Sequence, residues 1–186
     1  MPRPTKQQIE DEILETAATL FARHGLKETS IQRVADAVGY SKTGLLHRFP
    51  TKEALQEAVV DRAIAEMRAI AAEADGLPLG PGRDRVVLTG VARLAMARPG
   101  AVALLLSGLM SAPDSEVLQQ IGGVVFTAFG IADPACVTEI DLPRMLRIVG
   151  ALGALAVTAV AMHDKLTAAD LGGIVEVGYD ALGHRR

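Results

Sequence analysis

The chain has 186 residues, of which 49% are hydrophobic and 22% charged, and its formal net charge at pH 7 is −3. This composition excludes a disordered chain, because enough apolar residues are present to build a core, and the length allows a small module followed by a second core. A single cysteine, Cys136, excludes an intramolecular disulfide and a cysteine-based metal cluster. We expect a cytoplasmic protein without a metal or cofactor.

The acidic excess is not spread evenly along the chain. Residues 1–60 contain eight Lys and Arg and eight Asp and Glu, whereas residues 61–186 contain 11 basic and 14 acidic residues. Attraction to nucleic acid depends on where charge is placed on the contact face, so a neutral N-terminal module can still bind DNA. Whether the N-terminal module binds DNA therefore has to be judged from the positions of its basic residues.

The first predicted helix carries Ile9, Ile13, Ala17 and Phe21 on one face. We expect it to end at Gly25, because glycine adopts the left-handed conformation after a helix at little cost. The N-terminal residues, up to the acidic run at 10–12, lack the apolar segment that an export signal requires, so no such signal is expected.

Three more helices are expected from their capping residues. Thr29, with Gln32 three residues later, predicts a capping box at the start of a second helix. Ser41 predicts the start of a third, Lys42 to Phe49, and Thr51 that of a fourth, reaching Ala74. Two short helices around a glycine-containing turn form a helix-turn-helix.

Residues 21–55 also carry a longer motif in a fixed spacing. It consists of Phe21, Gly25, Thr29-Ser30-Ile31, Val34-Ala35, Gly39-Tyr40-Ser41, Leu45, Leu46, Phe49, Lys52 and Leu55. This motif resembles the TetR family of bacterial transcriptional repressors, in which a tyrosine that touches a DNA phosphate usually stands at the place of Leu46, and a valine at that of Tyr40. The resemblance leaves open whether Tyr40 or His47 replaces the missing contact.

In a helix-turn-helix the N-terminal residues of the second helix enter the major groove. We therefore expect Lys42, Thr43 and Gly44 to meet base edges. The expected phosphate contacts are Thr29, Ser41, His47, Arg48 and Lys52. Taken singly, these basic residues could equally be solvated surface charges.

The remainder of the chain is predicted to be helical, which makes the fold all-α with about nine helices. We divide it into a helix-turn-helix domain, 1–52, and a larger helical domain, 53–186, with a loop at 76–82. The later helices are expected at 83–97, 99–110, 113–129, 142–162 and 168–182. The apolar run Ile148–Met162 has 15 residues, fewer than the roughly 20 of a membrane span, and is expected to be a buried helix.

The resemblance implies a small-molecule effector bound among the middle helices and a homodimer formed by the last two long helices, which would read a palindromic operator. Candidate pocket residues are flexible or aromatic: Met67, Met96, Leu105, Met110, Phe126, Phe129 and Met145. Plain core packing is the competing interpretation of each. Five polar residues in these apolar stretches could anchor an anionic ligand but are rather expected to form ion pairs: Arg93, Arg98, Arg144, Arg147 and His163.

Two other classes of function compete with a DNA-binding regulator. An enzyme is disfavoured, because the four histidines lack the spacing of a helical metal site and no nucleophile motif is present. A helical interaction protein that has lost operator binding is the alternative that Leu46 favours.

Overall fold

The computed structural model describes residues 5–131 and 141–184, which are helical and contain no strand. The helices of these residues are α1 (Lys6–Glu28), α2 (Ile31–Ala37), α3 (Lys42–Arg48), α4 (Lys52–Ala74), α5 (Pro81–Ala97), α6 (Pro99–Ser111), α7 (Glu116–Ala128), α8 (Leu142–Ala161) and α9 (Leu171–Ala181). The expected all-α fold is confirmed.

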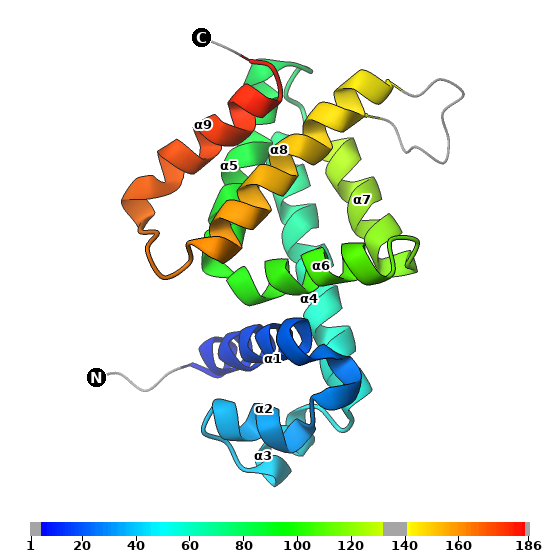
Figure 1. Cartoon of the computed structure of the whole chain (residues 1–186), viewed down its shortest axis with the longest axis vertical. Coiled ribbons are helices and arrows are strands. Elements are labelled where there is room, and N and C mark those ends of the chain that lie inside the picture. Colours follow the sequence, from blue (N-terminus) through cyan, green and yellow to red (C-terminus); the bar gives the residue numbers. More distant parts are fainter. Residues whose placement is uncertain (1–4, 132–140, 185–186) are drawn as a thin grey trace.

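The helices form two bodies joined by α4 (Figure 1). Helices α1 to α3 lie at one end of the molecule, and α5, α8 and α9 lie at the other. Helix α6 lies next to α1 and so connects the two bodies a second time. Helix α3 therefore lies at the end of the molecule formed by the smaller body.

The smaller body has its own core, made by one face of α1. Ile13, Ala17 and Phe21 are buried there, as their spacing predicts. Gly25 has a φ of 77°, which interrupts α1 at the expected residue, although one further helical turn follows up to Glu28. Apolar periodicity and the glycine therefore located this helix correctly.

The capping box predicted for α2 is wrong. Ser30, rather than Thr29, is the N-cap, and its hydroxyl accepts a hydrogen bond from the Arg33 backbone. Gln32 instead donates to Asp36 at 2.6 Å, one turn further along α2. The caps of the next two helices are confirmed, because Ser41 and Thr51 accept backbone hydrogen bonds at the starts of α3 and α4.

Helix α4 contributes to both cores. Leu55 and Val59 pack in the core of the smaller body, whereas Ile64, Met67 and Ile70 pack in the larger one. The first two turns of α4 thus belong with the helix-turn-helix, although they fall within the second predicted domain, 53–186. A continuous helix of 23 residues links the bodies rigidly.

Helix α8 has two apolar faces. Ile148, Ala151 and Leu155 are buried in the larger core, where α8 packs against α5 and α9. The opposite face exposes Leu146, Val149 and Val157 by 53–63%. By length and composition α8 could also cross a membrane, and 22% of its apolar window is buried. The expectation of a buried helix therefore holds for one face only.

Candidate nucleic-acid interface

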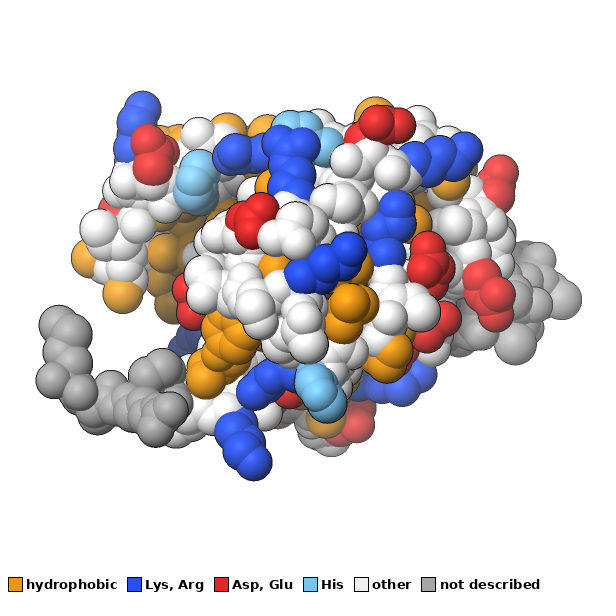
Figure 2. All heavy atoms as spheres, turned by 90° about the horizontal axis from the view of Figure 1, so that it is seen from below, with side chains coloured by type: hydrophobic (Ala, Val, Ile, Leu, Met, Phe, Trp, Pro, Cys, Tyr) orange, Lys and Arg blue, Asp and Glu red, His pale blue; other side chains and the backbone are white. Residues whose placement is uncertain are grey.

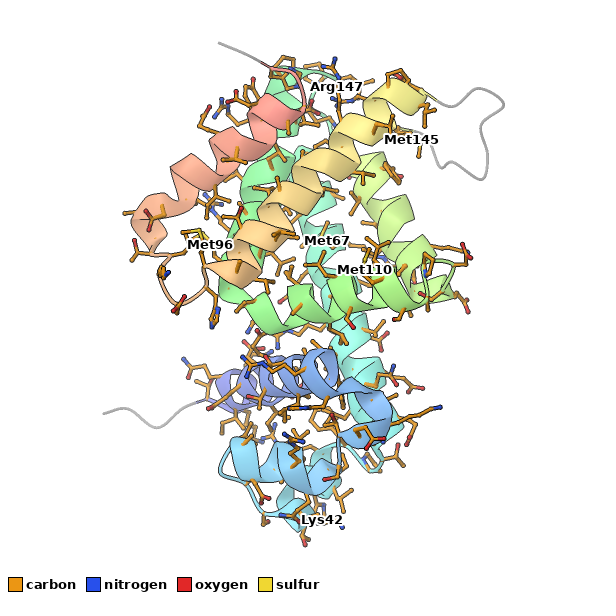
Figure 3. The ribbon with its side chains drawn as sticks, viewed as in Figure 1. Lys42, Met67, Met96, Met110, Met145 and Arg147 are labelled. Carbon is orange, nitrogen blue, oxygen red and sulfur yellow. The ribbon has the colours of Figure 1, made fainter. Side chains whose placement is uncertain are left out.

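Helix α3 packs against the core of the smaller body with its inner side, and its outer side is exposed. Leu45 is fully buried and Phe49 is 8% exposed, both in the core with α1 and α4. Lys42 and Thr43, at the start of the helix, are exposed, and Lys42 lies at the tip of the molecule (Figure 3). The two residues expected to meet base edges are therefore presented outward on a helix with a fixed position.

Ser41 and Gly44 form the first turn of α3. The Ser41 hydroxyl accepts a hydrogen bond from the Gly44 backbone at 3.0 Å. A Cβ at position 44 would lie only 3.1 Å from that hydroxyl oxygen, so glycine also leaves space for the cap. The presence of glycine at position 44 thus has a local structural reason, in addition to the close approach to DNA that its position predicts.

Thr29 was predicted to contact a phosphate, and the structure contradicts this. Its side chain is 1% exposed, and its hydroxyl donates to the carbonyl oxygens of Gly25 at 2.9 Å and Leu20 at 3.2 Å. A buried hydroxyl needs such partners, which turns Thr29 inward. Ser30 is exposed in its place.

Lys52 also forms hydrogen bonds within the protein. Its ammonium group donates to the carbonyl oxygens of Leu26, at 2.8 Å, and Lys27, at 3.3 Å. These carbonyls belong to the last turn of α1, where helix carbonyls lack partners of their own. Lys52 therefore caps α1 in this structure, and its role as a phosphate contact stays a prediction.

The remaining expected contacts lie along α3. His47 is exposed, whereas Arg48 is half-buried and lies 3.7 Å from Glu10 of α1. Leu46 and Tyr40 are both half-buried. The Tyr40 ring lies beside the first turn of α3, 3.8 Å from where a Cβ of Gly44 would be, so it borders the residues that face outward.

One pair of residues near this face was not predicted from the sequence. Nη2 of Arg33, on α2, lies 2.9 Å from Nε2 of His24, at the end of α1, and both side chains are exposed. Because Arg33 can only donate, Nε2 of His24 is the acceptor in this arrangement. The helix preceding the reading helix lies over the DNA backbone in this motif, a rule that could have drawn attention to Arg33.

Figure 2 shows the molecule from the end that carries α2 and α3. Lys and Arg side chains are spread over this face, and most acidic side chains lie toward its right-hand edge in that view. Phosphate attraction requires such local placement of charge and not a positive net charge. The neutral composition of residues 1–60 is therefore compatible with a basic contact face.

The candidate pocket residues do not surround one point. In Figure 3, Met96 and Met145 lie at widely separated places in the larger body. Met67 and Phe129 are buried in its core, and Met110, at the end of α6, is 80% exposed. Because most of its surface is exposed, Met110 is corrected from a pocket residue to a surface residue.

A small pocket lies away from these candidate residues, between α1, α4 and the start of α6. Its lining residues are Leu14, Glu15, Val59, Arg62, Ala63, Glu66, Arg98 and Ala101. None of the seven candidate pocket residues is among them. Within residues 5–131 and 141–184, no group of three or more His, Cys, Asp or Glu side chains is placed to hold a metal ion.

Residues 13–59 match the family described as bacterial regulatory proteins, tetR family. The chain is 44% identical over 50 residues to the HTH-type transcriptional repressor KstR2 of Mycolicibacterium smegmatis, which is 27% of this chain and 24% of that protein. It is 37% identical over 62 residues to the repressor AcnR of Corynebacterium diphtheriae, a third of each chain. The matches thus span about a quarter to a third of these relatives.

Solved structures are similar over the whole chain. AmtR of Mycobacterium smegmatis has a TM-score of 0.62 and 21% identity, covering 100% of this chain and 91% of that one. A TetR-like regulator from Rhodococcus sp. RHA1 has a TM-score of 0.61 and 17% identity, covering 98% and 100%. At these identities the likeness shows a common fold. Residues 13–59 therefore match the tetR family of bacterial regulatory proteins, and the chain as a whole shares the all-helical fold of the TetR-like regulator.

Proposed function

We propose that the protein is a cytoplasmic transcriptional repressor that reads an operator with α3. The observation that carries this proposal is the position of Lys42 and Thr43, exposed at the tip of the molecule on a helix whose other side is anchored by Leu45. Lysine can donate to guanine, and the threonine methyl can contact thymine in the major groove. Ser41, His47 and Arg48 would contact the flanking phosphates.

The operator is proposed to be palindromic, because two copies of the chain would bind it together. Helix α8 has an exposed apolar face with Leu146, Val149 and Val157, and α9, which packs against α8, exposes Val177 by 49%. A second copy related by a two-fold axis would cover the same face on both chains. Two α3 helices would then be presented to successive major grooves.

An apolar effector is proposed to bind the larger body and to alter operator affinity. Met96, Leu105 and Phe126 are half-buried and pack against the larger core, which gives them more freedom to move than the buried Phe129, and Met145 is also half-buried. A ligand that binds the two conformations of the protein with different affinity shifts the balance between them.

The test is a selection of binding sites from a random DNA pool at near-physiological salt, followed by affinity measurements on the enriched site. Lys42→Ala and Thr43→Ala are expected to relax the sequence preference at one or two base pairs, each costing about 1–3 kcal/mol. Lys165→Ala removes the same charge as Lys42→Ala from an exposed loop of the larger body and serves as the matched control.

Enrichment of a palindrome whose recognition depends on Lys42 but not on Lys165 would support the proposal. If the folded protein enriches no sequence, or binds DNA weakly and without dependence on salt, the reading role of α3 is wrong. The alternative, a helical interaction protein that has lost operator binding, would then account for Leu46.

A further inference from the structure

The two bodies meet at a cluster of charged side chains, which we call the interdomain joint. It consists of Asp11 and Glu15 of α1, Arg62 and Glu66 of α4, and Arg98 and Gly100 at the corner between α5 and α6. Its members come from three places in the sequence, and the small pocket described above lies among them.

Four of these residues form a closed ring of ion pairs. Asp11 lies 3.0 Å from Arg62 and 3.2 Å from Arg98. Glu66 completes the ring, 3.2 Å from Arg62 and 3.4 Å from Arg98. The four side chains are 16–30% exposed, so these pairs are screened less than surface pairs are. The ring holds α1 to α4 and to Arg98, the residue before α6, at the same time.

Glu15 makes the contact that is specific to α6. Its Oε1 accepts a hydrogen bond from the backbone N–H of Gly100, 2.5 Å away in the first turn of α6. Its other oxygen, Oε2, is buried without a hydrogen-bond partner. A buried carboxylate with one oxygen unpartnered is costly when ionised and less costly when protonated.

The backbones of α1 and α6 approach each other very closely here. A Cβ at Gly100 would lie 2.8 Å from the backbone oxygen of Glu15 and would collide with the hydroxyl of Thr19. Only glycine allows this approach, because it has no Cβ. Docking of α6 on α1 therefore leaves Glu15 half-buried, with its Oε2 atom shielded from solvent.

We propose that the interdomain joint is a proton-linked latch, in which Glu15 holds the first turn of α6 against α1 and ionisation of its carboxyl group loosens that contact. The charged groups that face Glu15 are Asp11 on its own helix, Arg62 and Glu66 on α4, and Arg98 at the α5–α6 corner. The ring of ion pairs would keep the bodies connected while the contact with α6 opens.

The direction of the proton linkage follows from burial. Burial raises the pKa of Glu15 above its ordinary value, outweighing the hydrogen bonds from the backbone of Gly100 and Ala101 and the attraction of Arg62, which lower it. Between the ordinary and the raised pKa, the closed joint binds more proton than the open one. Acid therefore favours closure, and rising pH favours opening, by at most about tenfold per pH unit for a single proton.

Hydrogen–deuterium exchange of the full chain, without DNA, tests the latch between pH 5 and pH 8. After correction for intrinsic exchange rates, amides in the first turn of α6 are expected to exchange faster as pH rises, while the buried amides of α8 stay unchanged. Glu15→Gln keeps an acceptor for Gly100 but no charge, so the turn should stay protected at every pH. Glu15→Ala should lose protection throughout, and Glu12→Gln, exposed on the same helix, should match the parent.

Protection of the α6 turn that does not vary with pH in the parent, or that varies equally in Glu15→Gln, would overturn the proposal. Gly100→Ala is a second probe: it should open the turn at all pH values, whereas Gly82→Ala, with open space around its Cβ, should not. The effect on operator affinity rests on the proposed function, but exchange does not. The exchange experiment can therefore support the latch even if the protein binds no operator. Conversely, operator binding can be found even if the latch is absent.

Discussion

Asp84, at the start of α5, is completely buried, and its carboxylate lies 2.6 Å from Nη2 of Arg144 at the start of α8. Nε2 of His184, beyond the end of α9, lies 2.6 Å from the second carboxylate oxygen. One acidic side chain thus connects three segments that are 60 and 100 residues apart in the sequence. Both contacts lie in the larger body, remote from α3.

Replacement of this buried acid is expected to destabilise the protein. Asp84→Ala leaves Arg144 half-buried without its partner, at a cost of about 3 kcal/mol. Urea unfolding should show this loss, while Asp61→Ala, which removes an exposed carboxylate from α4, should change stability by less than about 0.5 kcal/mol. Equal stability of the two variants would mean that the pair contributes nothing.

Lys52 is expected to behave as a structural residue. Lys52→Ala removes the hydrogen bonds to the carbonyls of Leu26 and Lys27 and should lower the free energy of unfolding by about 1 kcal/mol. The salt dependence of DNA binding should stay as in the parent. Lys27→Ala removes an exposed charge nearby and is the control for stability. Unchanged stability with a salt slope reduced by about one unit would instead identify a phosphate contact.

Position 46 offers a gain of function. Leu46→Tyr places a phenolic hydroxyl where the family usually has one, and should tighten operator binding by about 1 kcal/mol, the contribution of one hydrogen bond. The salt slope should not change, because a neutral hydroxyl displaces no counterion. Leu46→Phe has the same ring without the hydroxyl. If Phe tightens binding as much as Tyr, the gain comes from packing and not from a phosphate contact.

The apolar face of α8 is expected to be the subunit interface. Val149→Asp introduces a charge at the middle of this face and should convert a dimer into a folded monomer in sedimentation experiments. Operator affinity should fall with it, since one reading helix is lost. Ala65→Asp, at an exposed position of α4, should leave the dimer intact. A Val149→Asp protein that remains dimeric would place the interface elsewhere.

The sequence by itself located most helices of the smaller body. Their signals are local: Ser41 and Thr51 accept hydrogen bonds from amides three residues away, and Gly25 adopts its conformation whatever surrounds it. The motif of residues 21–55 is also contiguous, so the spacing of its residues was enough to assign Lys42 and Thr43 to the exposed start of α3.

The tertiary structure was needed to establish the roles of residues whose partners are distant in the sequence. Whether Thr29 or Ser30 caps α2 depended on the carbonyls of α1 that the fold places beside Thr29. Lys52 meets α1 25 residues away, and Asp84 meets Arg144 60 residues away. Local capping is read from a few consecutive residues, whereas burial and ion pairing depend on which helix faces come together, and apolar periodicity shows only that a face is apolar and not what covers it.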